Sequence, residues 1–252
     1  MPEPVLRIQG LSKNFGGLAA VRDVWLDLHI AELHAVIGPN GAGKSTLINV
    51  MSGDLPPSNG SVRYEGKEIA GLSPDRISRL GIARSYQKVN IFPWFTVFEN
   101  CRLAAQSRLK SSMRFLRPAR KYTEVNQTAE RALALTGLAR RAGSFAAALS
   151  HGEQRQLEIA MTLATSPRVL LLDEPLAGMG PEESLQLLAL ISKLAVDHAI
   201  LLVEHDIDAV FSVARVLTVM VNGRVLESGA PSAIRRSTAV QEAYLGKEEP
   251  VP

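Results

Sequence analysis

One short stretch near the start of the chain has the residue types and spacing that phosphate binding requires. Its members are Gly38, Pro39, Asn40, Gly41, Ala42, Gly43, Lys44, Ser45 and Thr46, which fit the pattern G-x-x-x-x-G-K-[ST]. The glycines let the backbone curl so that its N–H groups point inward, in conformations that a side chain would resist. Lys44 places a cation at the β- and γ-phosphates of a nucleotide, and Ser45 offers a hydroxyl to Mg²⁺.

Two adjacent acids in the last third of the chain suit metal binding and base catalysis. Asp173 and Glu174 follow an apolar run at residues 169–172, and open α/β sheets bind their ligands at the carboxyl ends of such strands. Asp173 suits a Mg²⁺ ligand. Glu174, one step further toward solvent, could polarise an attacking water as a general base. The alternative is that the two acids form a solvated turn with no chemical role.

The phosphate-binding stretch lies between two elements that could hold it in place. An apolar run at residues 33–37 precedes it, and a helix-compatible run at 47–51 follows it. This is the strand–loop–helix context that the motif needs, and the helix start adds its positive dipole end to the site. The alternative is a glycine-rich strand-to-helix turn that binds nothing.

Composition places the chain among globular proteins. Of its 252 residues, 46% are hydrophobic and 21% are charged, which is enough for a packed core in one large or two small domains. The net charge of +3 gives no argument for nucleic-acid binding. The single cysteine, Cys101, excludes an internal disulfide and fits a reducing compartment. We find neither an apolar run of about 18 residues nor a signal peptide, so we expect a cytosolic protein.

The first third of the chain is strand-rich, and the middle is helical. The expected elements are strands at 5–8, 24–30, 61–64 and 83–86, and helices at 73–81, 96–107 and 123–135. Ser73 and Pro74 are suited to start the first of these helices, and Gly81 to end it. Thr96 and Glu99 have the spacing of a capping box. We expect a helical insertion over residues 90–165.

The last third returns to alternating strands and helices. We expect strands at 169–172 and 199–203, helices at about 153–165 and 181–196, a hairpin at 220–225 and a frayed tail over 247–252. In the helix at 181–196, Leu185, Leu188, Ile191 and either Leu194 or Ala195 share one face. We predict that this face is buried.

A basic run falls within the helical middle. It contains Arg108, Lys110, Arg114, Arg117, Arg120 and Lys121, with no acid among residues 108–121. The simplest interpretation is a solvated surface. The alternative is a face that lies near anionic lipid or a partner protein.

A second motif lies between the helical middle and the acid-bearing strand. Residues 149–154 read Leu-Ser-His-Gly-Glu-Gln, which resembles the signature L-S-G-G-Q of ATP-binding cassette (ABC) ATPases. From the residues alone, Ser150 and Gly152 precede a helix, which suits either an anion site or an ordinary helix cap. The resemblance implies that Ser150 and Gly152 contact ATP held by a second subunit.

Other residues then match motifs of the same family, and the resemblance implies a role for each. Gln87 resembles the glutamine that touches Mg²⁺ and the attacking water, and His205 resembles the switch histidine at the γ-phosphate. Phe15 resembles the aromatic residue that stacks on adenine. Residues 177–180 occupy the position of the D-loop.

Three residues depart from the family pattern. His151 replaces the first signature glycine, Glu153 replaces the signature glutamine, and Gly180 stands where the D-loop commonly has an acid or an amide. By position, His151 and Glu153 would lie near the partner's nucleotide. They would therefore affect how tightly that half-site binds the partner's ATP.

The narrower resemblance is to ATP-binding subunits of branched-chain amino acid importers and their urea or amide relatives. Residues 81–84, 157–161, 174–179 and 242–246 carry it. It implies an α/β fold of the P-loop NTPase, ABC type: a RecA-like core with an N-terminal antiparallel β part and an inserted helical subdomain, within one domain over residues 1–246.

The resemblance also implies the function and the partners. We expect ATP hydrolysis with Mg²⁺, head-to-tail pairing with an identical or related ATPase, and membrane permeases with an external solute-binding protein. The protein would then lie on the inner face of the cell membrane. The alternatives are a soluble ABC ATPase of repair or translation, and an interaction module gated by nucleotide with an inactive site.

Overall fold

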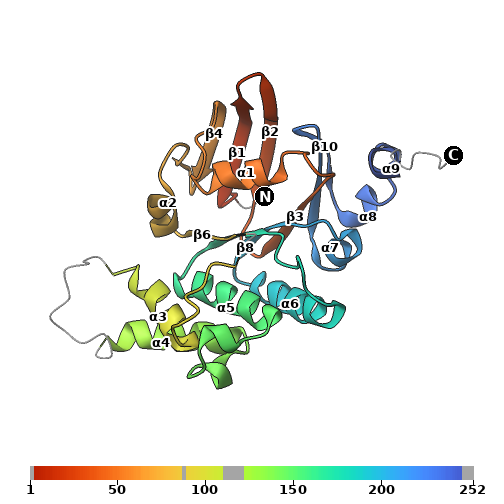
Figure 1. Ribbon diagram of the computed structural model, residues 1–252. Helices are drawn as coiled ribbons and strands as arrows, with labels where there is room; N and C mark the ends of the chain where they lie inside the picture. The colour runs from red at the N-terminus through yellow and green to blue at the C-terminus, as the bar shows by residue number, and fades with distance from the viewer. Residues whose placement is uncertain (1–2, 87–88, 110–121, 246–252) are drawn as a thin grey trace.

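The computed structural model describes residues 3–86, 89–109 and 122–245, and two β-sheets form its frame (Figure 1). The first sheet has the order β2-β1-β4-β5 and is antiparallel where its pairings are given. Its strands are β1 (Leu6–Phe15), β2 (Leu18–Leu28), β4 (Asn59–Tyr64) and β5 (Lys67–Glu68).

The second sheet has the order β10-β9-β3-β8-β7-β6, and only the β9–β10 pair is antiparallel among its described pairings. Its strands are β3 (Glu32–Ile37), β6 (Ile82–Ser85), β7 (Val169–Asp173), β8 (Ala199–Val203), β9 (Val216–Val221) and β10 (Arg224–Gly229). Every residue of β3, β7 and β8 is buried, as expected for parallel strands covered on both faces.

Helices cover both faces of this parallel sheet (Figure 1). On one face, α1 (Lys44–Met51) lies between the two sheets, and its apolar residues join a core with those of β1 and β2. On the other face lie α5 (His151–Ala164) and α6 (Pro181–Leu194). The remaining helices are α2 (Pro74–Leu80), α3 (Val97–Gln106), α4 (Thr123–Leu135), α7 (Ile207–Val213), α8 (Pro231–Ile234) and α9 (Thr238–Leu245).

The register of the central strands brings their carboxyl ends to one edge of the sheet. Glu32 of β3 pairs with Ala199 of β8, and Asp173 of β7 pairs with Val203 of β8. Beyond the strands, the Glu174 N–H donates to the Val203 carbonyl over 2.9 Å. The segments that follow β3, β7 and β8 therefore leave the sheet side by side.

Several predicted elements are confirmed. Helix α4 spans the predicted range, and Gly81 in the left-handed conformation ends α2. Thr96 and Glu99 form the predicted capping box, in which the Glu99 N–H donates to Thr96 Oγ1 over 3.1 Å. The hairpin β9–β10 turns at Asn222 and Gly223, both with positive φ.

Other predicted bounds are wrong. Strand β1 continues to Phe15, beyond the predicted end at residue 8, and β2 runs over Leu18–Leu28, without His29 and Ile30. The ladder between β1 and β2 contains several register shifts. Such bulges interrupt the two-residue periodicity from which strand ends are predicted.

The buried face of α6 also differs from the prediction. Leu188, Ile191 and Leu194 are buried as predicted, but Leu185 is 68% exposed, and Leu187 is fully buried in its place. In a helix, positions 185 and 188 are neighbours along one stripe, but here Leu187 and not Leu185 joins Leu188, Ile191 and Leu194 in the core. The residues against which α6 packs decide which leucine is buried, and the sequence of the helix alone does not identify those residues.

Some predictions fall outside the described residues, namely Gln87, most of the basic run (residues 110–121) and the tail from residue 247. Of the basic run, Arg108 is described, and its guanidinium donates to the Ser78 carbonyl over 2.8 Å. Within the described ranges, the structure has no helix with the length and apolar character of a membrane span.

The two leucines of α6 give a test of this packing. We expect Leu187→Ala to lower the free energy of unfolding by about 2–5 kcal/mol, because it opens a cavity in the core. Leu185→Ala, on the same helix, serves as the matched control and should change it by less than about 0.5 kcal/mol. Urea unfolding of both variants measures the difference. Equal losses would mean that the face of α6 is assigned wrongly.

Candidate functional site

The candidate phosphate-binding loop joins β3 to α1, and two of its glycines are required by close backbone contacts. A Cβ on Gly38 would lie 2.2 Å from the Met220 carbonyl oxygen, and one on Gly43 would lie 2.3 Å from the Ala20 carbonyl oxygen. Gly43 also has a φ of 99° and immediately precedes the first residue of α1. Only glycine fits these positions without displacing neighbouring backbone.

Lys44 folds back onto this loop. Its Nζ donates to the Gly38 carbonyl over 2.6 Å and to the Pro39 carbonyl over 3.1 Å, and the residue is only 5% exposed. Burial lowers the pKa of Lys44, while the nearby charges of Glu174 and Asp173 act to raise it. The ammonium group is therefore held beside the loop by contacts that phosphate oxygens could replace.

Asp173, the last residue of β7, is buried with its two carboxylate oxygens in different surroundings. Oδ2 accepts a hydrogen bond from Arg84 over 2.9 Å. Oδ1 is buried and makes no hydrogen bond to the part of the chain that the structure describes. Burial raises the pKa of Asp173, and the Arg84 charge opposes this. A buried carboxylate oxygen without a donor is suited to Mg²⁺ or to a water of its shell, so the residues present fit such an ion.

Glu174 contacts His205 across the edge of the sheet. Its Oε1 lies 2.5 Å from His205 Nε2. Glu174 was expected one step further toward solvent than Asp173, and it is the more exposed of the two, at 7% against 3%. Both residues are buried, and Glu174 has a positive φ of 49° at the point where the chain leaves β7. Two residues far apart in the sequence are thus within one hydrogen bond of each other.

Glu204 was missed by the sequence analysis. It follows β8 and is buried at 3% exposure. Its carboxylate accepts the Leu176 N–H over 2.8 Å and the His205 N–H over 3.2 Å, and burial raises its pKa to about 7. Glu204 therefore joins the segment after β7 to the segment after β8. Its position directly after an apolar strand, like that of Asp173, was a signal that could have found it.

Ser150 directly precedes α5 and is the N-cap of this helix. The Glu153 N–H donates to Ser150 Oγ over 3.2 Å, and the Ser150 N–H donates to Glu153 Oε2 over 2.9 Å. The helix begins at His151, two residues before the predicted start near Glu153. The capping box explains the earlier start, because it satisfies two backbone N–H groups of the first turn. It also gives Glu153 a structural role in this chain.

The start of α5 packs against the segment after β7. A Cβ on Gly152 would lie 2.6 Å from Glu183 Oε1, so the Glu183 side chain covers this glycine. A Cβ on Gly178 would lie 3.5 Å from the imidazole carbon Cε1 of His151. The signature residues therefore lie beside residues 177–180, on the face of the sheet opposite α1 (Figure 1).

Phe15, the candidate adenine-stacking residue, ends β1 and is 45% exposed. Lys13 Nζ lies 5.2 Å from the centre of its ring, which is a cation–π distance. Part of the ring surface is thus open to a ligand. The other candidate, Gln87, lies in the gap between the described ranges.

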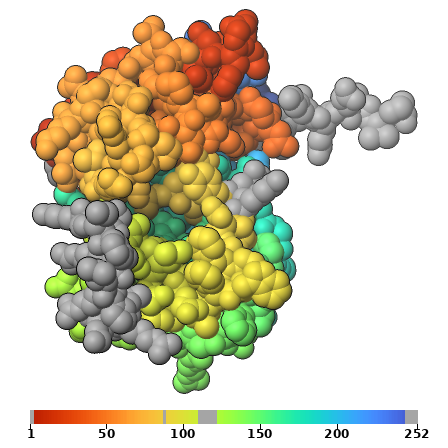
Figure 2. All heavy atoms as spheres, turned by 60° about the vertical axis from the view of Figure 1, so that its left-hand side comes forward, coloured from red at the N-terminus to blue at the C-terminus, as the bar shows by residue number. Residues whose placement is uncertain are grey.

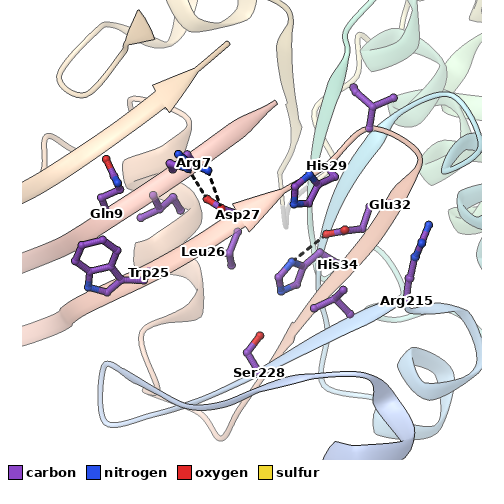
Figure 3. A pocket seen from close by; sticks show the side chains of 13 residues that line it. Arg7, Gln9, Trp25, Leu26, Asp27, His29, Glu32, His34, Arg215 and Ser228 are labelled. Atoms are coloured by element: carbon purple, nitrogen blue, oxygen red, sulfur yellow. Dashed lines mark hydrogen bonds and ion pairs between the residues drawn. The ribbon is translucent and has the colours of Figure 1, made fainter. Parts of the chain in front are cut away.

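A cavity of about 740 Å³ lies at the other end of β3 (Figure 3). It is lined by residues of β1 and β2, among them Arg7 and Asp27, which pair over 3.0 Å. Glu32 and His34, at the start of β3, also line it. The phosphate-binding loop follows the opposite end of the strand, so this cavity is separate from the site described above.

Comparisons with known proteins identify the family. The sequence model described as "ABC transporter" matches residues 21–177. The chain is 39% identical to the high-affinity branched-chain amino acid transport ATP-binding protein BraF of Pseudomonas aeruginosa, over 98% of this chain and 100% of that protein. The chain belongs to the ABC transporter family.

Further relatives agree with this ABC assignment. LivG of Escherichia coli K12, also a high-affinity branched-chain amino acid transport ATP-binding protein, is 38% identical over 98% of this chain and all of that protein. The ADP conformation of MJ1267, an ATP-binding cassette of an ABC transporter, superposes with a TM-score of 0.85 at 29% identity, covering 98% of this chain and 100% of that one. The predicted ABC fold is thus confirmed, and the chain is a nucleotide-binding ATPase.

The raised pKa of Glu204 predicts a pH dependence of stability. Its pKa is about 7 in the folded protein against 4.5 ordinarily, so between these values the folded state binds more protons than the unfolded state. The free energy of unfolding therefore falls as pH rises through this window. Glu204→Gln cannot titrate. We expect the stability of the variant relative to wild type to rise by roughly 1–3 kcal/mol between pH 5 and 7.5.

Urea unfolding at several pH values across this window measures the difference. The control is Glu182→Gln in the exposed first turn of α6, whose stability should stay parallel to wild type. The pH dependence of the stability difference is the informative quantity. The amide also has one hydrogen-bond acceptor fewer than the carboxylate, which changes the free energy of unfolding by the same amount at every pH. Parallel curves for Glu204→Gln and wild type would contradict the raised pKa.

Proposed function

We propose that this chain is the ATP-hydrolysing subunit of an importer for branched-chain or other hydrophobic amino acids. The observation that carries the proposal is the 38–39% identity, over nearly the whole length, to proteins named for that transport in Pseudomonas aeruginosa and Escherichia coli. The clustering of Lys44, Asp173, Glu174 and His205 at one sheet edge supports an active rather than an inactive site. An importer for urea or short amides is the alternative.

Each site residue has a proposed role in this reaction. The loop Gly38–Thr46 and Lys44 hold the phosphates, and Phe15 stacks on adenine. Ser45, Asp173 and Gln87 serve the Mg²⁺ that accompanies ATP, a cation that draws charge from the phosphates. The buried Oδ1 of Asp173, which accepts no hydrogen bond from the described residues, supports this assignment.

Glu174 is the proposed general base, and His205 holds it in place. The 2.5 Å contact from His205 Nε2 holds one carboxylate oxygen in place, and a carboxylate at this position is suited to orient a water and accept its proton. His205 is 46% exposed at its side chain, so the same imidazole can reach a γ-phosphate from solvent. Gln87 lies outside the described residues, and its role at the water rests on the family motif.

The proposed working form is a head-to-tail dimer. Ser150 caps α5 and Gly152 lies in its first turn, and α5 lies on the face of the sheet opposite α1 (Figure 1). In this proposal the two residues complete the site of a partner ATPase, identical or related. ATP then makes contacts in the closed dimer that the open one lacks, and hydrolysis removes this link. One domain over residues 1–246, with its helical subdomain at about 90–165 and a tail at 247–252, forms each half.

This chain has a surface next to β6 that suits contact with a membrane subunit. A hollow of about 330 Å³ lies between α2, β6, α3 and α5, on the side that Figure 2 brings forward. Beside it on the chain, Trp94 is 81% exposed, and Phe92 and Phe95 are 46% and 43% exposed. Exposed aromatic clusters of this kind mark protein contacts. We propose that a permease binds here, which places the chain at the inner face of the membrane.

Uptake by cells tests the transported solute. In a strain that lacks this gene, the wild-type chain should restore uptake of radiolabelled leucine, and Glu174→Gln should not. Restored uptake of urea without leucine would select the alternative. Failure of the chain to co-purify with any membrane subunit would favour a soluble ABC ATPase.

Lys44→Ala tests the phosphate site. The substitution removes a charged hydrogen-bond donor worth about 1.5–3 kcal/mol, so we expect ATP affinity to fall at least about tenfold. Equilibrium binding of a fluorescent ATP analogue measures this, with circular dichroism as the control for folding. Near-normal affinity would remove Lys44 from its assigned role.

Glu174→Gln tests the base. The amide keeps the shape of the side chain and loses its basicity, so we expect ATP binding to persist and hydrolysis to fall by roughly 10²–10⁴-fold. Because ATP would then stay in its bridging position, dimers should accumulate with MgATP on a sizing column. Phosphate release near the wild-type rate would refute the assignment, and His205 would be the next candidate.

A further inference from the structure

Arg84, on β6, joins two parts of the nucleotide site. One guanidinium nitrogen donates to Asp173 Oδ2 over 2.9 Å. The other lies 2.6 Å from Asn49 Oδ1, 2.9 Å from Ser52 Oγ and 2.7 Å from Asp54 Oδ2. Asn49 belongs to α1, and Ser52 and Asp54 follow its last residue. The guanidinium therefore bridges the strand that carries the candidate metal ligand and the helix that follows the phosphate-binding loop.

The surroundings of Arg84 hold it in one orientation. Its side chain is only 9% exposed. The Tyr86 ring centre lies 4.7 Å from the guanidinium carbon, and Ser52 Oγ donates to Asp54 Oδ2 over 2.7 Å. A planar guanidinium with fixed donors transmits such positioning better than the single charge of a lysine.

The contact with Arg84 gives the two oxygens of the Asp173 carboxylate different surroundings. Oδ2 is occupied by Arg84, while Oδ1 is buried without a hydrogen bond from any described residue. Carboxylates that bind metals are themselves held by hydrogen bonds, and loss of such a partner typically weakens metal binding by about 10–100-fold. Arg84 occupies the position of such a partner.

We propose that Arg84 is a positioning residue for Mg²⁺. It fixes the Asp173 carboxylate against α1, so that Oδ1 faces the ion that accompanies ATP. The inference rests on the Mg²⁺ role proposed above for Asp173. It adds that the Arg84 side chain fixes the position of the candidate metal ligand relative to α1.

Charge and orientation predict opposite effects, which makes the inference testable. If Arg84 acted only through its positive charge, its removal would strengthen binding of a cation nearby. If it acts by orientation, removal weakens Mg²⁺ binding, and lysine does not restore it, because one ammonium group cannot reproduce the two-sided bridge. We expect orientation to dominate.

The experiment measures nucleotide binding as a function of free Mg²⁺, without relying on turnover. A fluorescent ATP analogue is titrated onto the purified full chain in EDTA and at increasing Mg²⁺. For Arg84→Gln and Arg84→Lys we expect affinity in EDTA within about twofold of wild type and a half-saturating Mg²⁺ concentration raised by about tenfold or more. Arg63→Gln, which removes an exposed arginine 3.7 Å from Glu68, is the matched control and should match wild type.

Two further variants keep the test decisive. Asn49→Ala leaves Arg84 in place and removes one of its supports, so it should raise the half-saturating Mg²⁺ concentration by a smaller factor even if Arg84 variants fold poorly. In an Asp173→Asn background, Arg84→Gln should cause no additional change, because its effect passes through that carboxylate.

The outcomes separate this inference from the proposed Mg²⁺ site. Unchanged or tighter Mg²⁺ dependence in Arg84→Gln, with wild type responding to Mg²⁺, would overturn the role of Arg84 alone. A wild-type chain whose nucleotide binding ignores Mg²⁺ would instead overturn the proposed metal site. A full effect of Arg84→Gln in the Asp173→Asn background would show that Arg84 acts through another group.

Discussion

The hydrogen-bonded ladder β3–β8–β7 is the constraint on which the rest of the structure depends. Its parallel register ends the three strands at one edge, and each strand continues directly into site residues. The loop before Lys44 follows β3, Glu174 follows β7, and Glu204 follows β8. A shift of one register position would exchange the faces of a strand and separate the carboxylates from the lysine.

The same edge concentrates buried charge. Lys44, Asp173, Glu174 and Glu204 are each less than a tenth exposed, and desolvation of such groups is costly. The structure offsets this cost with specific partners, which are loop carbonyls for Lys44, Arg84 for Asp173 and backbone N–H groups for Glu204. Burial also strengthens every electrostatic interaction within the site. Burial of these charges thus lowers the stability of the fold and fixes the charges in position, which is a common arrangement at functional sites.

Helix α5 connects this edge to the helical side of the molecule. Arg155 and Glu158 form a buried ion pair at 2.8 Å. Arg155 donates to the Tyr86 carbonyl over 2.8 Å, and Glu158 accepts the Tyr86 N–H over 3.2 Å. The helix that Ser150 caps therefore holds both backbone groups of Tyr86, the residue just before Gln87. Movement of α5 relative to the sheet must displace the chain at the end of β6.

The sequence alone determined the family and several helix bounds, and it predicts the phosphate-binding loop and the acid pair, because these depend on local features: fixed spacing, caps such as Thr96, and continuous apolar strands. Tertiary structure decided which groups meet. The contact of Glu174 with His205 joins the segments that follow β7 and β8, and the contact of Arg84 with Asp173 joins β6 to β7. Likewise, burial of Leu187 in place of Leu185 depends on the core against which α6 packs. Residue spacing along one chain carries no information on such partners, because strand order and packing bring them together.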